Sequence, residues 1–176
     1  CAKAASFLVF CDSFNIPIVM LVDVPGFLIG VDGERKAAPG KIINWMNAQS
    51  LCTVPKITIV LRKSYGQAYI NMGGNKNSDE FALWPTADVG FMDPNTAVNV
   101  VFGIKKEDDP EEYARRVEQL ARDAAPWELA AMYEAQDVIA PQETRQHIIN
   151  MLDIHTMRRT NGVGEHLMRT WPTSIT

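Results

Sequence analysis

Two short turns carry the residue types that could do chemistry in this chain. The first is Asp23-Val24-Pro25-Gly26-Phe27, and the second is Tyr65-Gly66-Gln67-Ala68-Tyr69. Each follows an apolar run of strand length and contains a glycine where the backbone must turn sharply. If such a turn opens a helix, its first N–H groups have no partner within the helix and can stabilise an anion or an oxyanion. A glycine in a loop more often serves only the turn itself, so spacing alone leaves both interpretations open.

The elements that must position these turns alternate between helical and extended patterns. Apolar residues at three- and four-residue spacing predict a helix over 2–14, which Asn15 caps and Pro17 ends. The continuous apolar run over 17–24 predicts a strand buried on both faces. This alternation indicates the α/β class with right-handed crossovers, in a single domain. The other expected elements are a surface loop over 28–39, a helix over 41–51, a second buried strand over 54–61, a loop over 73–77, short extended pieces at 81–84, 89–92 and 138–139, and helices over 94–102, over 110–123 (with Asp109 as N-cap), from 126 and over 141–157.

Composition and charge exclude several classes of function. Hydrophobic residues make up 47% and charged residues 22% of the 176 residues, which is typical of a globular protein. The net charge of −4 and the scattered Lys/Arg pairs do not indicate a nucleic-acid surface. The longest apolar run, 16–22, is too short to span a membrane. Cys1, Cys11 and Cys52 lack paired spacing, which argues against a disulfide framework or a zinc site and fits a reducing, cytoplasmic location.

Other candidate residues have a plainer interpretation. His147 and His155 lie eight residues apart on one expected helix, and no Glu or Cys motif completes a ligand set with them or with His166, so we expect structural or surface histidines and no metal. Asp23 ends a strand and is expected to be a hydrogen-bonded carboxylate rather than a general base. The segment 73–76 lacks the ending of a P-loop, and 108–123 is expected to be a solvated helix face.

Five motifs, in order along the chain, give the sequence a family resemblance. The chain resembles the carboxyltransferase (beta) subunits of biotin-dependent acyl-CoA carboxylases, of the propionyl-CoA carboxylase and methylmalonyl-CoA carboxyltransferase type. Five motifs in the same order are far more specific than any one of them. The motifs are Lys3-Ala4-Ala5-Ser6-Phe7 through Ile16-Pro17, Leu21-Val22-Asp23-Val24-Pro25-Gly26-Phe27-Leu28, Val54-Pro55-Lys56-Ile57-Thr58 with Arg62-Lys63-Ser64-Tyr65-Gly66, Trp84-Pro85-Thr86-Ala87, and Asp137-Val138-Ile139-Ala140-Pro141 with Thr144-Arg145.

The resemblance implies a fold and a place within a larger subunit. The family has a crotonase-like (ClpP/crotonase) α/β fold with repeated ββα units, and two such domains form a subunit. Residues 1–176 are similar to the C-terminal, biotin-side domain, and we expect this domain to be N-terminally incomplete because the chain starts inside the pattern at Cys1. We expect the tail, about 158–176, to dock on a neighbouring subunit. The family's active sites lie at a dimer interface within a hexamer, so the resemblance implies a dimer-based homo-oligomer.

The resemblance also implies a cofactor, partners and site residues. The carboxyl group comes from carboxybiotin on a biotin carboxyl carrier protein charged by a biotin carboxylase, and the acceptor is an acyl-CoA. Backbone amides stabilise the ureido oxygen of biotin, which takes the α-proton of the acyl group, and positioning and oxyanion stabilisation are the protein's contribution. Carried over, the oxyanion amides are Gly66, Gln67 and Ala68; Pro25, Gly26, Phe27 and Tyr69 lie on the biotin side; and Tyr65 and Ile70 lie in the substrate pocket.

Three departures from the family pattern bear on the site. Gln67 stands where the family has glycine, and a side chain there disfavours a positive φ. Ile70 stands where the family has an aspartate tied to substrate choice, which indicates a different or larger acyl group than propionyl. The segment 93–97 also differs from the family's usual sequence.

Two alternatives to the carboxyltransferase remain. One is another crotonase-type enzyme, such as an acyl-CoA decarboxylase or hydratase, although the motifs contain no carboxylate pair for a hydratase. The other is a non-catalytic partial domain or interaction module that lacks the half that binds CoA.

Overall fold

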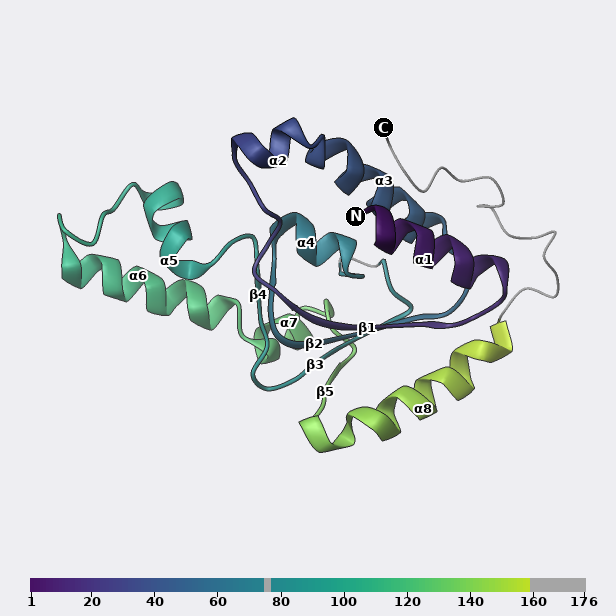
Figure 1. Ribbon diagram of the computed structural model, residues 1–176. Coiled ribbons are helices and arrows are strands. Elements are labelled where there is room, and N and C mark those ends of the chain that lie inside the picture. The colour runs from purple at the N-terminus through teal and green to yellow at the C-terminus, as the bar shows by residue number, and fades with distance from the viewer. Residues whose placement is uncertain (75–76, 159–176) are drawn as a thin grey trace.

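The computed structural model describes residues 1–74 and 77–158, and it is an α/β fold built on a parallel sheet (Figure 1). The strand order is β1-β2-β3-β5, and β4 pairs with the last residues of β2 beyond the end of β3. The strands are β1 (Ile18–Val24), β2 (Lys56–Tyr65), β3 (Glu80–Leu83), β4 (Asp88–Gly90) and β5 (Asp137–Val138). The helices are α1 (Ala2–Ser13), α2 (Val31–Arg35), α3 (Ala38–Leu51), α4 (Gly66–Asn71), α5 (Pro94–Ala97), the π-helix η1 (Val98–Phe102), α6 (Pro110–Asp123), α7 (Pro126–Ala131), the 3₁₀ helix η2 (Pro141–Glu143), α8 (Thr144–His155) and the 3₁₀ helix η3 (Thr156–Arg158).

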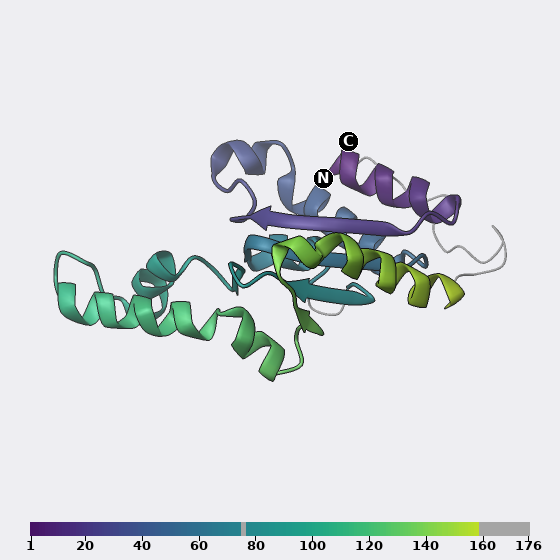
Figure 2. The ribbon, with the colours of Figure 1, turned by 90° about the horizontal axis from the view of Figure 1, so that it is seen from below.

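The sheet separates two apolar cores. On one face, α1, α3 and α4 cover a core that includes Val22, Val60 and Leu83. On the other face, α8 packs on a smaller core formed by Ile57 and Ile59 of β2 with Ala82 and Ile139. Figures 1 and 2 show the N-terminal helices and α8 on opposite sides of the strands. Strands with apolar residues on both faces need this arrangement, because each face must be removed from water.

Strand β1 was expected to be buried on both faces, but the structure shows that only one of its faces is buried. Its residues alternate between buried and exposed, and the side chains of Val19 and Leu21 are 39% and 54% exposed. These two residues pair in register with Ile57 and Ile59, so they lie on the face that α8 covers at β2 but leaves open at β1. A continuous apolar run shows that both faces are apolar, but it does not show that another element covers them.

Two other expectations about the first half were incomplete. The segment 28–39, predicted as a surface loop, contains α2 and the start of α3, separated by Ala37 in a left-handed conformation (φ 54°). Strand β2 continues to Tyr65 rather than ending near 61, because β4 takes over from β3 as its partner at 63–65. A polar, glycine-containing stretch and a long-range strand pairing both escape local pattern analysis.

Several helix ends match the sequence-based expectation. Asn15 has φ 57° and follows α1, and the N–H groups of Asn15 and Ile16 donate to the carbonyls of Asp12 and Cys11 at 3.3 and 2.9 Å. This is the pattern of a Schellman motif, which satisfies the last carbonyls of a helix. The carboxylate of Asp109 accepts the N–H of Glu112 at 3.0 Å, so Asp109 caps α6 as predicted.

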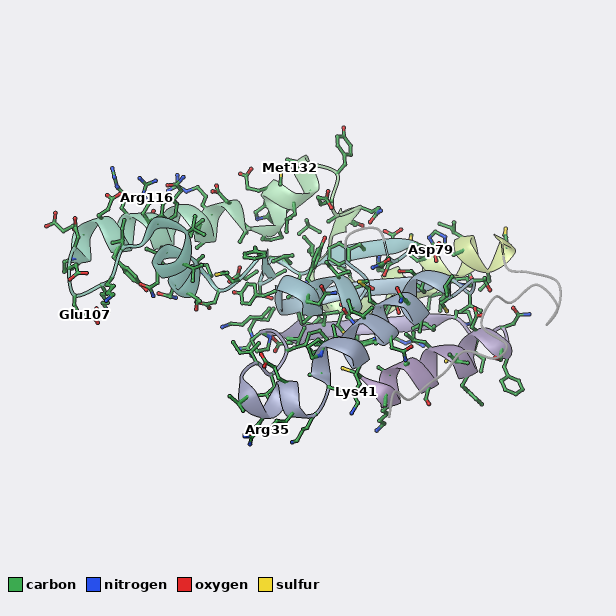
Figure 3. All side chains as sticks on the ribbon, turned by 90° about the horizontal axis from the view of Figure 1, so that it is seen from above. Arg35, Lys41, Asp79, Glu107, Arg116 and Met132 are labelled. Atoms are coloured by element: carbon green, nitrogen blue, oxygen red, sulfur yellow. The ribbon has the colours of Figure 1, made fainter. Side chains whose placement is uncertain are left out.

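Helices α5, η1 and α6 form an arm that projects beyond the carboxyl ends of the strands (Figures 1 and 3, with Glu107 and Arg116 labelled). The helix predicted over 94–102 is an α-helical turn followed by the π-helix η1. The guanidinium of Arg116 lies 4.7 Å from the ring centroid of Phe102, and α6 buries only Tyr113. Most of α6 is therefore a solvated surface, as expected.

No helix among residues 1–74 and 77–158 is long and apolar enough to cross a bilayer. The tail over 159–176, with His166, lies outside the described residues, so its expected docking role has no structural counterpart here.

Candidate active site

Asp23 holds together the end of β1 and β2, just before the first turn. The pairing of β1 with β2 is regular up to Val22 and Val60 and then shifts, so that Val24 faces Ser64. The carboxylate of Asp23 fills the irregularity by accepting the backbone N–H of Lys63 at 3.2 Å and both Nε and a terminal N–H of Arg62 at 3.0–3.2 Å. The hydrogen bond from Arg62, with that from the Lys63 backbone, lowers the pKa of Asp23. A carboxylate held in this way is a structural acceptor, as predicted, rather than a base.

The first turn packs against helix α3. Gly26 has φ 139°, a conformation that L side chains rarely adopt, and Phe27 lies edge-on to Trp45 of α3 with ring centroids 5.7 Å apart. Further along the loop, a methyl group at Gly33 would lie 2.9 Å from the carbonyl oxygen of Leu28, so α2 can approach the loop closely only with glycine there. The turn is thus fixed from one side by α3 and from the other by α2.

The second turn connects β2 directly to α4. Gly66 is the left-handed residue, with φ 58°, and a methyl group on it would lie 3.0 Å from the carbonyl oxygen of Phe91. Gln67 lies inside α4 as its second residue, so the side chain that replaces the family's glycine does not sit at the position that needs a positive φ. Gly66 therefore makes the turn, and Gln67 follows within α4 without a positive φ.

The side chain of Gln67 ties α4 to α3. Its Nε2 donates to Oδ1 of Asn71 at 2.8 Å and to the sulfur of Met46 at 3.3 Å. The Nδ2 of the buried Asn71 donates in turn to the carbonyl of Ile42 at 2.9 Å. Because Trp45 of the same helix supports Phe27, one helix positions both turns.

Both turns line one cavity of about 500 Å³, which we call the first cavity. Its lining is mainly apolar and comes from the loop after β1, the starts of α3 and α4, and the segment after β4. The sequence placed Pro25, Gly26 and Phe27 beside Gly66 and Gln67, and the structure brings these residues together. The lining residues are Pro25, Gly26, Phe27, Leu28, Ile29, Gly30, Gly33, Glu34, Ala38, Pro39, Ile42, Tyr65, Gly66, Gln67, Phe91, Met92, Asp93 and Thr96.

A second cavity, of about 510 Å³, adjoins the first at the same turn. Gly66, Gln67 and Phe91 line both cavities, and we call these three residues the shared wall. Ala68 is buried and lines neither of the two. The lining residues of the second cavity are Gly66, Gln67, Tyr69, Ile70, Val89, Gly90, Phe91, Leu129 and Glu134.

The two tyrosines of the second turn face different cavities. Tyr65, expected in the substrate pocket, lines the first cavity with the expected biotin-side residues, whereas Tyr69 lines the second cavity with Ile70. The hydroxyl of Tyr65 donates a hydrogen bond to the carboxylate of Asp88, and Lys63 lies 5.9 Å from the ring centroid. Burial, together with Asp88, raises the pKa of Tyr65 well above its usual value. Its hydroxyl thus remains protonated at physiological pH and can donate, but it is not a base.

The family follows from comparison with known proteins. A family model described as "Carboxyl transferase domain" matches residues 1–166, which is most of the chain. The chain belongs to the carboxyl transferase domain family. Members of this family differ in the reaction that their names state, so the individual relatives bear on the function.

The relatives of this carboxyl transferase domain include enzymes named for carboxyl transfer and enzymes named for decarboxylation. The chain is 42% identical over 170 residues to the methylmalonyl-CoA carboxyltransferase 12S subunit of Propionibacterium freudenreichii subsp. shermanii, covering 93% of this chain and 32% of that protein. It is 39% identical over 160 residues to the methylmalonyl-CoA decarboxylase subunit alpha of Veillonella parvula, covering 90% of this chain and 31% of that protein. The chain therefore spans about a third of the length of these relatives.

Solved structures confirm the crotonase-like fold of the domain. A transcarboxylase 12S hexamer with methylmalonyl-CoA and methylmalonic acid bound superposes with a TM-score of 0.83 at 41% identity, covering 91% of this chain and 32% of that one. The beta subunit of P. aeruginosa geranyl-CoA carboxylase has a TM-score of 0.79 at 24% identity, covering 92% of this chain and 33% of that one, and shares the fold.

Two histidines of this carboxyl transferase domain, His147 and His155, belong to α8 and line neither cavity. His147 and His155 are structural, as expected: their Nε2 atoms lie 3.9 and 3.7 Å from the two oxygens of the buried Glu80. No group of three or more His, Cys, Asp or Glu side chains in the described part of the chain could hold a metal ion.

The site in this carboxyl transferase domain includes residues from distant segments that the sequence did not predict as part of it. Phe91 and Asp88 belong to or follow β4, and they reach the second turn because β4 pairs with the end of β2. The segment 89–92 was recognised as an extended piece, but its partner strand was not. Leu129 and Glu134 come from the region of α7, more than fifty residues after the turn, where no motif or spacing signals a site.

Proposed function

We propose that the protein containing this chain transfers a carboxyl group from carboxybiotin to an acyl-CoA, with this chain as the biotin-side domain. The observation that supports the proposal is the cavity lined by both turns, since Pro25, Gly26 and Phe27 line it together with Gly66 and Gln67. Relatives named for carboxyl transfer between acyl-CoA substrates, at 42% identity, support the same reaction class.

The lining of the first cavity fits a biotin group. It is mainly apolar and about 500 Å³ in volume, which suits the small, uncharged bicyclic ring system of biotin. Gly66 lines this cavity and carries no side chain, and an added methyl group would lie 3.0 Å from the carbonyl oxygen of Phe91. When bound, carboxybiotin supplies the carboxyl group that is transferred.

The residues of this chain then act by hydrogen bonding and positioning. In the proposal the backbone N–H groups of Gly66, Gln67 and Ala68 donate to the ureido oxygen as negative charge develops on it. The first N–H groups of a helix have no partner within that helix, so they are free to donate outward. Such a donor can change the rate by about 10²–10³-fold. Pro25, Gly26 and Phe27 form the opposite wall, which fixes the orientation of the ring.

The acyl-CoA belongs on the other side of the shared wall. Ile70 and Tyr69 line the second cavity, so the position that the family fills with aspartate faces an apolar space here. An apolar residue supports an acyl group that is larger than propionyl. Tyr65 lies on the first-cavity side, and its hydroxyl already donates a hydrogen bond to Asp88. It could donate to a ligand only after breaking this bond, so we assign Tyr65 a role in supporting the turn.

The proposed partners are the biotin carboxyl carrier protein, a biotin carboxylase and a second copy of this protein. Leu28, Ile29 and Phe91 surround the first cavity and are 74%, 89% and 79% exposed. Large apolar side chains that cluster at the mouth of a cavity are typical of a surface that another protein covers. The transcarboxylase 12S relative forms a hexamer, which supports a dimer-based homo-oligomer.

One alternative reaction has specific support. The methylmalonyl-CoA decarboxylase subunit alpha of Veillonella parvula is 39% identical over 160 residues, and its name states removal of the carboxyl group. A hydratase is less well supported. The first cavity has two carboxylates, Glu34 and Asp93, but Asp93 caps α5 and lies 3.7 Å from Lys63, so it is not free to pair with Glu34 in catalysis.

The test measures transfer by the full-length subunit that contains this chain. It is mixed with a biotin carboxylase, biotinylated carrier, ATP, labelled bicarbonate and a panel of acyl-CoAs. Acid-stable label on at least one acyl-CoA is expected. Ala68→Pro removes one proposed N–H donor and should lower the rate by about 100-fold or more.

A matched control is Glu111→Pro, which places proline in the first turn of the exposed helix α6, far from both cavities. It should transfer label at the wild-type rate. If the folded wild-type protein and a charged carrier label no acyl-CoA, the carboxylase proposal is overturned. Loss of label from a carboxylated acyl-CoA in the same mixture would then favour the decarboxylase.

A further inference from the structure

The second cavity contains an acidic residue in otherwise apolar surroundings. Tyr69, Ile70, Val89, Phe91 and Leu129 supply most of its side-chain wall. Glu134 is the acidic member of the lining, and no Lys, Arg or His among the described residues lines the cavity with it. Its carboxylate has no ion pair or side-chain hydrogen bond within the part of the chain that the structure describes, although the residue is half-buried.

A tight turn places Glu134 at this position. Helix α7 ends in a Schellman motif: the N–H of Tyr133 donates to the carbonyl of Ala130 at 3.1 Å, and the N–H of Glu134 donates to the carbonyl of Leu129 at 3.0 Å. Tyr133 has φ 60° and is 91% exposed, so the chain reverses through a conformation that is unfavourable for a non-glycine residue. Leu129 and Glu134 are thereby joined by a hydrogen bond and line the same cavity.

The shared wall connects this cavity to the proposed reaction site. Gly66, Gln67 and Phe91 line both cavities, so a group bound against these residues borders the second cavity and can extend into it. A volume of about 510 Å³ leaves room for an acyl chain several carbons longer than propionyl. A chain that enters this space meets apolar side chains and the carboxylate of Glu134.

We propose that Glu134 is a specificity-determining residue: the second cavity accepts an uncharged acyl chain, and Glu134 rejects acyl chains that end in a carboxylate. This inference rests on the proposed function, because it takes the occupant of the second cavity to be the acyl group of an acyl-CoA. A carboxylate held near Glu134 in an apolar cavity would lose hydration and gain a like-charged neighbour without a cation to offset either cost. An uncharged chain of the same length instead gains apolar burial.

The test compares the binding of two ligands of equal chain length, hexanoyl-CoA and adipoyl-CoA, to the full-length subunit by isothermal titration calorimetry. The wild-type protein should bind hexanoyl-CoA about tenfold or more tightly than adipoyl-CoA. Glu134→Lys should shift the ratio of the two Kd values by about tenfold or more toward adipoyl-CoA, and Glu134→Gln should shift it less. Glu128→Lys makes the same charge change at an exposed position of α7 outside the cavity, and it should leave the ratio unchanged.

Equal affinities in the wild-type protein, a ratio that Glu134→Lys does not change, or no binding of either ligand would each overturn the inference. Binding is measured without the carrier or bicarbonate, so its outcome is separate from the transfer assay. A protein that discriminates between the ligands but transfers no label would contradict the proposed reaction and leave Glu134 as a selector of acyl-CoA ligands.

Discussion

At the scale of single residues, the site depends on backbone conformation more than on titratable side chains. Two ionisable side chains within the turns are engaged with partners: Asp23 with Arg62, and Tyr65 with Asp88. What remains for chemistry is the backbone at Gly66, whose left-handed φ and contact with the carbonyl of Phe91 exclude a side chain. At Gly66 the site is therefore sensitive to small changes in backbone shape.

Gly66→Ala tests this dependence. The methyl group would be strained at φ 58° and would lie 3.0 Å from the carbonyl oxygen of Phe91, so the turn must shift. We expect carboxyl transfer to fall by about 100-fold or more, with a loss of about 1–2 kcal/mol in the free energy of unfolding. Transfer assays and urea denaturation measure the two effects.

Gly103→Ala is the matched control. Gly103 has a similar φ of 66°, but nothing lies within 4 Å of an added methyl group, and it lines neither cavity. It should cost about 1 kcal/mol in stability while leaving transfer unchanged. Equal losses of activity in the two variants would show that backbone strain, and not the site, explains the effect of Gly66→Ala.

At the scale of elements, local sequence patterns predicted where helices begin and end better than they predicted which strand faces are covered and which strands pair. The cap at Asp109 and the end of α1 at Asn15 were predicted because capping is a property of adjacent residues. The open face of β1 and the pairing of β4 with β2 were not, because they depend on which distant segment lies alongside. The same reason explains why the two turns were recognised as one site while Leu129 and Glu134 were missed.

The end of α7 offers a prediction at this scale. Tyr133 occupies the left-handed position of a Schellman motif, where glycine has no steric cost, and its exposed ring contributes little packing. Tyr133→Gly should therefore raise the free energy of unfolding by about 0.5–1 kcal/mol, as measured by urea denaturation.

Asn15→Gly provides the comparison, because Asn15 occupies the same position after α1 with φ 57°. Asparagine tolerates this conformation better than tyrosine, so the gain should be smaller. A loss of stability in Tyr133→Gly would indicate that the tyrosine makes a contact that outweighs its strain.

At the scale of the whole molecule, stability should decline at high pH because a buried thiol must ionise when the chain unfolds. Burial, aided by the carboxylate of Asp12, raises the pKa of Cys52 from 9.0 to about 12. The raised pKa contributes stability that is fully present below pH 9 and is lost as the pH rises from 9 to about 12. In that window Cys52 should make the free energy of unfolding fall by about 1.4 kcal/mol per pH unit.

Cys52→Ala should reduce the dependence of the unfolding free energy on pH by about 1.4 kcal/mol per pH unit, which corresponds to one proton. At neutral pH the same substitution lowers stability, because it removes a buried side chain. Chemical denaturation between pH 9 and 11 measures the slope. Cys1→Ala, at an exposed position, controls for the loss of a thiol. Identical slopes in wild type and Cys52→Ala would contradict the assignment of the alkaline instability to Cys52.

The wall formed by Gly66, Gln67 and Phe91 has a thermodynamic consequence for the two cavities. A ligand in either cavity contacts Gly66, Gln67 and Phe91. The side chain of Gln67 is linked to α3 through hydrogen bonds that involve Asn71. Any movement of the wall that one ligand induces changes the affinity for the other, and the coupling free energy is the same in both directions. The order in which the two ligands arrive therefore leaves the total free energy of the filled site unchanged.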